Sequence, residues 1–162
     1  MAERLNTRAL LGPSAREILG TELNVLKGNI AQNIMQHNAN ASGRTIRSLS
    51  VRVSEDGDTY TGELTGRPFF GALETGSKPW RNQYKHPPLF FREIIQQWID
   101  DKGLDLNAYL VARKIMRTGS KLYREGGRDS IYSKEIRKTI ERVNRRALQF
   151  WNNVLTNNIK LN

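Results

Sequence analysis

Two long helical patterns, one near each end of the chain, constrain the fold more than any other feature. The first is an apolar stripe at steps of three and four residues: Leu19, Leu23, Leu26, Ile30 and Ile34. The second stripe has the same spacing: Ile136, Ile140, Val143, Ala147, Phe150 and Val154. This spacing places each set on one face of a helix, so we predict helices over about residues 14–38 and 133–160. Ser14 and Glu17 have the spacing of a capping box, which marks the start of the first helix.

Between these helices the hydrophobic period changes to two. Leu49, Val51 and Val53 alternate with polar residues, which predicts a half-buried strand over residues 46–53. The following Asp56-Gly57 is a hairpin turn signal. We therefore expect a meander of two or three antiparallel strands.

Two further helices follow a proline-rich loop. An apolar stripe that ends near Gly103 contains Phe91, Ile94, Ile95, Trp98 and Ile99. We interpret Phe91 and Trp98 as core residues of this helix, and Asp105 as the N-cap of the next one.

Together these elements predict an α+β fold, in which a small antiparallel sheet packs against long amphipathic helices and the C-terminal part is helical. The chain has 162 residues, which suits one domain. We place that domain at residues 13–162, after a flexible N-terminal arm at residues 1–12.

The residues offer little for catalysis. The chain has no cysteine, which excludes disulfides, thiolate catalysis and cysteine-based zinc sites. His37 and His86 match no metal motif and fit polar surface or loop positions. Asp100, Asp101 and Asp105 could bind a hard cation in a hydrolase or nuclease, but acids at a helix end are the commoner explanation. We therefore predict a protein that is not an enzyme, with no catalytic residues, metal or cofactor.

The net charge of +10 is concentrated in the C-terminal third, where residues 104–162 hold 13 Lys and Arg against 5 Asp and Glu. A positive field of this kind favours anionic partners such as nucleic acid or an acidic protein surface. The candidates to face a lumen or a partner are Arg113, Lys114, Arg117, Lys121, Arg124, Arg128, Arg137, Lys138, Arg142, Arg145 and Arg146. Non-specific nucleic-acid binding through these basic helices is therefore an alternative function. No apolar run approaches the roughly 18–20 residues of a membrane span, so we expect no membrane partner.

The segment of residues 67–80 favours assembly over enzymology, because it joins two aromatics, one acid and a turn of small residues. We interpret Glu74 as a structural acid that bonds turn amides or an Arg across a subunit boundary. The candidates for a subunit interface are Phe69, Phe70, Leu73, Glu74 and Gly76.

Three segments resemble motifs of the tailed-phage tail-completion and neck proteins, the gene-product-ten-like tail components. Residues 42–51 resemble the start of that family's first strand. Residues 70–77 resemble its aromatic, small, aliphatic, Glu, Gly-Thr core, with Ser77 where Thr is usual and Thr75 where an aromatic is usual. Residues 109–121 resemble its Ala-Arg-Lys-Ile helix end, and the three segments occur in the family's order.

The resemblance implies a structural virion protein at the head–tail joint or the tail terminus. It implies a homo-oligomeric ring, commonly a hexamer, that completes the tail and joins neighbouring connector and tail-tube proteins. The region matching residues 59–77 contributes to ring contacts in that family. Such a protein is found in the virion, and in the host cytoplasm during assembly. In such a ring the basic residues could line a lumen through which DNA passes, or meet an acidic partner ring.

Overall fold

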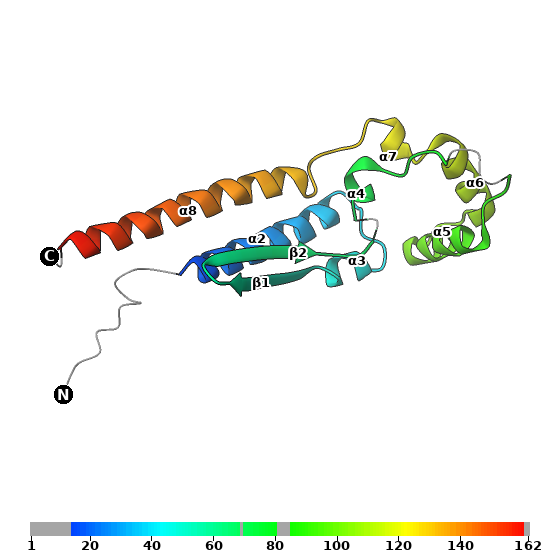
Figure 1. Ribbon diagram of the computed structural model, residues 1–162. Helices are drawn as coiled ribbons and strands as arrows, with labels where there is room; N and C mark the ends of the chain where they lie inside the picture. Colours follow the sequence, from blue (N-terminus) through cyan, green and yellow to red (C-terminus); the bar gives the residue numbers. More distant parts are fainter. Residues whose placement is uncertain (1–13, 69, 81–84, 161–162) are drawn as a thin grey trace. The chain divides into compact units, whose positions relative to one another are not determined.

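The computed structural model describes residues 14–68, 70–80 and 85–160 (Figure 1). The predicted N-terminal arm and Phe69 lie outside the described residues. The elements in chain order are α2 (Ala15–Gln36), α3 (Arg44–Arg47), β1 (Ser50–Asp56), β2 (Thr59–Thr65), α4 (Ala72–Thr75), α5 (Leu89–Lys102), α6 (Ala108–Thr118), α7 (Lys121–Arg124) and α8 (Ser133–Lys160). This confirms the predicted α+β class and the two long helices.

The chain divides into two compact units, which we describe separately. The first unit contains residues 1–29, 50–65 and 134–162, and the second contains residues 30–49 and 66–133. The extent of a single domain over residues 13–162 stays a prediction.

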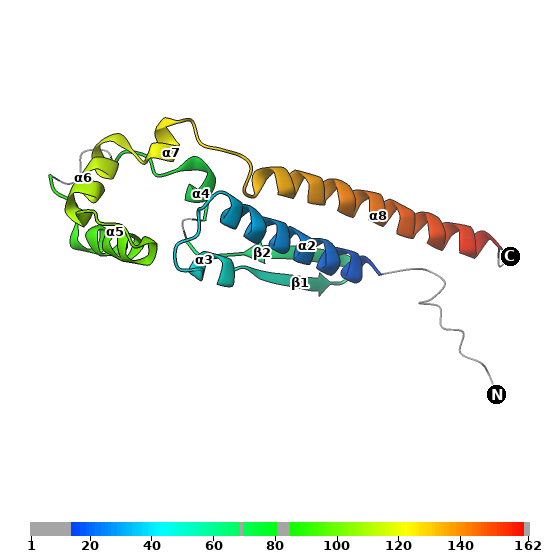
Figure 2. The ribbon, with the colours of Figure 1, turned by 180° about the vertical axis from the view of Figure 1, so that it is seen from behind.

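In the first unit, the hairpin β1–β2 lies along α2, and Figure 2 shows the same pairing from behind. The strands are antiparallel and pair from Ser50 with Thr65 to Asp56 with Thr59, as the turn signal predicts. Gly62 lets the hairpin approach the helix, because a Cβ atom there would lie 2.7 Å from the Cδ1 atom of Leu23. Among the described residues the sheet has two strands.

The predicted start of the first strand is wrong. Residues 44–47 form the short helix α3 instead, and β1 begins at Ser50. Gly43 has a left-handed conformation with φ 74°, which turns the chain into this helix. The amides of Arg47 and Ser48 then bond back to the carbonyl groups of Gly43 and Arg44, which completes a helical turn.

In the second unit, α5 and α6 pack around Ile95, Ile99 and Ala112, with four partly buried residues beside them: Phe91, Ala108, Val111 and Ile115. Phe91 therefore belongs to the core, as predicted. Trp98 does not, because its residue is 39% exposed while α6 covers the adjacent side of α5.

The predicted N-cap of α6 is also wrong. The helix begins two residues later than Asp105 would allow, and Asn107 caps it by accepting a hydrogen bond from the Leu110 amide at 3.1 Å. Within residues 14–160, as far as they are described, no helix is long and apolar enough to span a membrane.

Candidate functional site

The best-defined polar site is a clamp around Glu74, which lies on α4 and is only 3% exposed. Its Oε1 atom accepts hydrogen bonds from the backbone amides of Ile131 at 2.9 Å, Tyr132 at 2.7 Å and Ser133 at 3.0 Å. Its Oε2 atom accepts from the hydroxyl group of Ser133. The carboxylate thus binds the turn that leads into α8. Glu74 is a structural acid that bonds backbone amides, but these are amides of residues 131–133 and not of the small-residue turn beside it.

The electrostatics of the clamp favour an ionised carboxylate. Burial by itself raises the pKa of Glu74, but the Ser133 hydroxyl and the three backbone amides outweigh it, so the pKa is lower than that of an ordinary glutamate. Burial and the nearby charge of Glu74 raise the pKa of the Tyr132 hydroxyl. A carboxylate held this way stabilises the fold and is poorly placed to exchange protons with a substrate.

Of the three family-like segments, the second contains Glu74 and is hydrogen-bonded to the third. Ser77 and Ser120 join the second segment to the third, since the Ser120 amide donates to the Ser77 carbonyl at 2.9 Å and the Ser77 amide donates to the Ser120 hydroxyl at 3.0 Å. The Ser48 hydroxyl of the first segment accepts from the amide of Arg67, which lies outside the three segments, at 3.1 Å. The resemblance itself stays a prediction.

The other interface candidates contact residues of their own chain, and the side chains of Phe70 and Leu73 are only half-buried. Gly76 has φ 68°, and a Cβ atom there would lie 2.5 Å from the Tyr123 amide nitrogen, so glycine is required. Phe70 is half-buried, with its ring centroid 5.3 Å from that of Tyr132. Leu73 is also half-buried. The interface role of these residues stays a prediction.

A second clamp holds α8 in the first unit, and it uses two of the predicted basic residues. The buried carboxylate of Glu22 on α2 accepts from Arg142 Nε at 2.6 Å and lies 3.1 Å from Arg146 Nη1. About two turns closer to the start of α8, Glu135 lies 2.8 Å from Lys138 Nζ, and it accepts from the Asn29 side chain at 2.8 Å. Lys138, Arg142 and Arg146 therefore contact acids of their own chain.

The Glu135 carboxyl responds to these neighbours. The hydrogen bond from Lys138 holds its pKa below the ordinary value, against the opposing effect of burial, and the Asn29 amide contributes in the same direction. These residues consequently work as a polar contact between α2 and α8.

The other basic candidates are placed differently. Arg137 and Arg145 are exposed on α8, and Lys114 and Arg117 are exposed on α6. In the second unit Arg124 donates to Thr118 Oγ1 at 2.8 Å, and Lys121 lies 3.7 Å from Glu125 in an exposed pair. The Nε atoms of Arg113 and Arg128 are shielded from solvent. The candidates belong to two units, and their role of facing a lumen or a partner stays a prediction.

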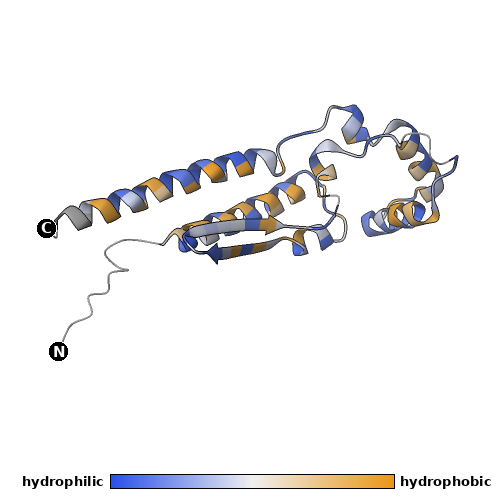
Figure 3. Ribbon diagram, in the orientation of Figure 1, coloured by the Kyte–Doolittle hydropathy of each residue, from blue (hydrophilic) through white to orange (hydrophobic). Residues whose placement is uncertain are grey.

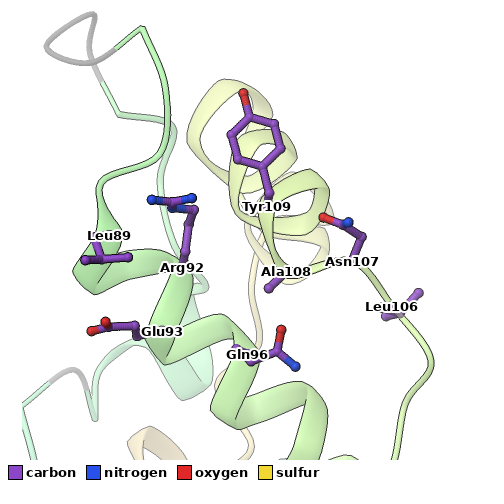
Figure 4. A pocket seen from close by; sticks show the side chains of 8 residues that line it. All are labelled: Leu89, Arg92, Glu93, Gln96, Leu106, Asn107, Ala108 and Tyr109. Carbon is purple, nitrogen blue, oxygen red and sulfur yellow. The ribbon is translucent and has the colours of Figure 1, made fainter.

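The second unit has an open hollow of about 390 Å³ between α5 and the start of α6 (Figure 4). Its lining has four residues from α5 and four from the α6 end: Leu89, Arg92, Glu93, Gln96, Leu106, Asn107, Ala108 and Tyr109. The Tyr109 hydroxyl lies 2.8 Å from His86 Nδ1. The charged residues that line the hollow are Arg92 and Glu93, and this pair provides neither a nucleophile nor a set of metal ligands.

Two of the acids considered as a cation site, Asp100 and Asp101, contact side chains of their own unit instead. Asp101 lies 2.7 Å from Arg44 Nη2, and Asp100 accepts from Gln96 at 2.8 Å. Among the described residues no group of three or more His, Asp or Glu side chains is arranged to hold a metal ion. His37 is exposed and lies 2.8 Å from the Ser130 hydroxyl.

Large apolar side chains remain exposed along α5 and α8, where Figure 3 shows recurring hydrophobic bands. On α8 these are Ile140, Leu148, Trp151 and Leu155, which are 55–65% exposed. On α5 they are Phe90, Ile94 and Trp98, which are 39–55% exposed. We call these two sets the α8 face and the α5 face.

The sequence patterns did not predict the contact of Glu22 with the arginines of α8 or the amide partners of Glu74. A signal for Glu22 existed, because it lies one turn before Leu26 on a helix whose neighbouring positions are apolar. A signal for the Glu74 partners also existed, since a helix start such as Ser133 attracts a carboxylate. The spacing of residues in the sequence does not show which acid binds the start of α8.

Comparison of the chain with protein-family models, with curated proteins and with solved structures finds no match in any of the three.

Proposed function

We propose that this chain is a non-enzymatic structural protein of a tailed-phage virion, which assembles with copies of itself into a ring at the head–tail joint or tail terminus. The observation that carries the proposal is the α8 face, a row of large apolar side chains that are more than half exposed. Contiguous exposed apolar surface on a globular protein marks an interaction site. A catalytic role would need converging reactive groups instead.

Two further observations support the proposal. The second and third of the segments that resemble tail-completion and neck proteins are hydrogen-bonded to each other through Ser77 and Ser120, which supports reading them as parts of one folded region. The hairpin β1–β2 has two strands in the described chain, and each therefore presents one unpaired edge. Unpaired edges accept strands from neighbouring subunits. In this proposal the ring, commonly of six copies, binds connector and tail-tube proteins.

The experiment is to measure the mass of the purified chain in solution, alone and with its connector and tail-tube partners, and to image it by negative-stain electron microscopy. We expect one closed species of fixed subunit number. A monomer under all these conditions, up to the highest soluble concentration, would refute the proposal.

Non-specific nucleic-acid binding stays the alternative, and α8 favours it through seven basic residues against two acidic ones. The contacts of Glu22 and Glu135 with Arg142, Arg146 and Lys138 weaken that case. A salt titration of duplex DNA binding separates the two functions. Affinity that falls steeply with salt supports the alternative, and no binding at low salt removes it.

A further inference from the structure

We propose that the α8 face of one copy docks on the α5 face of the next copy, so that the ring contact is heterologous. This inference rests on the proposed ring function, and it adds which two surfaces form the contact between neighbouring copies.

The α8 face lies on a different side of the helix from the Glu22 clamp. At about 100° per residue, Ile140, Leu148, Trp151 and Leu155 fall within about 80° of one another. Arg142 and Arg146, which contact Glu22, lie about 120° or more from them on the same helix. The helix is therefore held on one side, and it presents apolar side chains on another.

The α5 face is the uncovered part of a wide apolar surface. Phe90, Ile94 and Trp98 are spaced four residues apart and so form one row. Ile95 and Ile99 form the adjoining row, and they are buried against α6. Trp80 packs at the start of the uncovered row, with its ring centroid 6.2 Å from that of Phe90. The outer row therefore remains open in the described chain.

The α5 face matches the C-terminal part of the α8 face in length, and the two helices differ in charge. The α5 row spans eight residues, or about 12 Å, while Leu148 to Leu155 spans about 10 Å of an α8 face that extends about 22 Å from Ile140. The helix α8 has seven basic and two acidic residues, and three of the basic ones contact acids of their own chain, whereas α5 has two basic residues and three acidic ones. Opposite signs favour contact between α8 and α5, while two α8 helices side by side repel each other.

A heterologous contact also covers both open faces at once. Pairing α8 with α8 around a two-fold axis would leave the α5 face exposed on both copies. Pairing α8 with α5 leaves one face of each kind at the ends of any chain of copies, and these ends meet when a ring closes.

The area of this contact explains why closure is needed. Seven half-exposed side chains bury on the order of 800 Å² in total, since a buried aromatic covers roughly 150–250 Å². A stable interface buries at least about 1,200 Å². One contact is therefore weak, and we expect closed rings with few open dimers.

The absence of cysteine from the chain permits a direct test by crosslinking. One copy carries Ile94→Cys on the α5 face, and a second copy with a different tag carries Leu148→Cys on the α8 face. The copies are mixed and treated with a short bifunctional thiol reagent. We expect the mixed dimer to exceed either homodimer at least tenfold. Gln149→Cys, on the opposite side of α8, is the matched control and should give no mixed dimer above background.

Each other result overturns the inference in a recognisable way. A dominant Leu148→Cys homodimer would show an α8–α8 contact. An intrachain link in a monomeric Ile94→Cys, Leu148→Cys double variant would show that the chain covers its own face. Rings of the unmodified chain without any mixed crosslink would refute this contact while leaving the proposed function intact. Failure of the unmodified chain to form rings would instead refute the function and the inference together.

Discussion

Replacing Glu74 with glutamine tests the clamp most directly, because glutamine keeps the side-chain shape and removes the charge. The carboxylate accepts three backbone amides and one hydroxyl, all from residues 131–133. A hydrogen bond to a charged group contributes about 1.5–3 kcal/mol and a neutral one about 0.5–1.5 kcal/mol. Four such bonds would lose roughly 4 kcal/mol if they were independent, but bonds that share one group are not additive. We therefore expect Glu74→Gln to lower the free energy of unfolding by about 2–3 kcal/mol.

The pH dependence gives a second, independent readout. The pKa of Glu74 is lowered in the folded chain, so the unfolded chain takes up the proton first as the pH falls. The stabilisation is therefore fully present above the unfolded-state pKa of about 4.3, and it is lost as the pH falls through the lower folded-state pKa. The stability difference between the unmodified chain and Glu74→Gln should be largest above about pH 5 and should shrink in acid.

The assay is urea unfolding followed by circular dichroism at several pH values between about 3 and 7. Glu63→Gln, at an exposed position on β2, is the matched control and should change stability by less than about 0.5 kcal/mol. If Glu74→Gln is as stable as this control at pH 7, or if its deficit does not change with pH, the clamp does not hold the fold as argued.

Two other substitutions test the packing around the clamps. Glu22→Gln should lower the free energy of unfolding in urea by about 2 kcal/mol, because Arg142 and Arg146 lose their buried acid. The loss stays moderate because solvent still reaches both arginines. An equal loss in the exposed control Glu141→Gln would contradict this reasoning. Gly127→Ala and Gly126→Ala both place alanine at positive φ, but only at Gly127 would the new Cβ atom meet the Glu74 carbonyl oxygen, at 2.7 Å. We expect Gly127→Ala to be the less stable of the two by about 1 kcal/mol or more in thermal unfolding, and equal melting temperatures would refute the close contact.

The long helices and the hairpin could be predicted because their signals are local. The capping box of Ser14 and Glu17 forms as expected, with the Ser14 amide donating to Glu17 Oε2 at 2.9 Å and the Glu17 amide donating to the Ser14 hydroxyl at 3.3 Å. The spacing of the apolar residues predicted the extent of α8 to within a residue or two, because the same spacing continues along most of this 28-residue helix. Such patterns need no knowledge of distant segments.

The errors arose where a distant segment or a single turn decides the outcome. Leu49 is buried, which makes residues 46–49 look like the start of a strand, yet the left-handed Gly43 begins a helical turn before it. Trp98 has the spacing of a core residue, but its exposure depends on how much of α5 the helix α6 can cover. The partners of Glu74 lie 57–59 residues later in the chain, so its role could be predicted while its contacts could not.

The distribution of charge along α8 separates a part fixed by ion pairs from the part that carries most of the proposed contact. The ion pairs of this helix with Glu22 and Glu135 involve residues 135–146, in its first half. Residues 147–156 of the second half carry no charge, and they combine polar residues with Leu148, Trp151 and Leu155. A buried acid fixes a helix through charged hydrogen bonds that are strong and directional. An exposed apolar row binds through area, which tolerates small adjustments between subunits. A helix built in this order can keep its place in one subunit and still adapt to the next, and that combination is what closing a ring of identical copies demands.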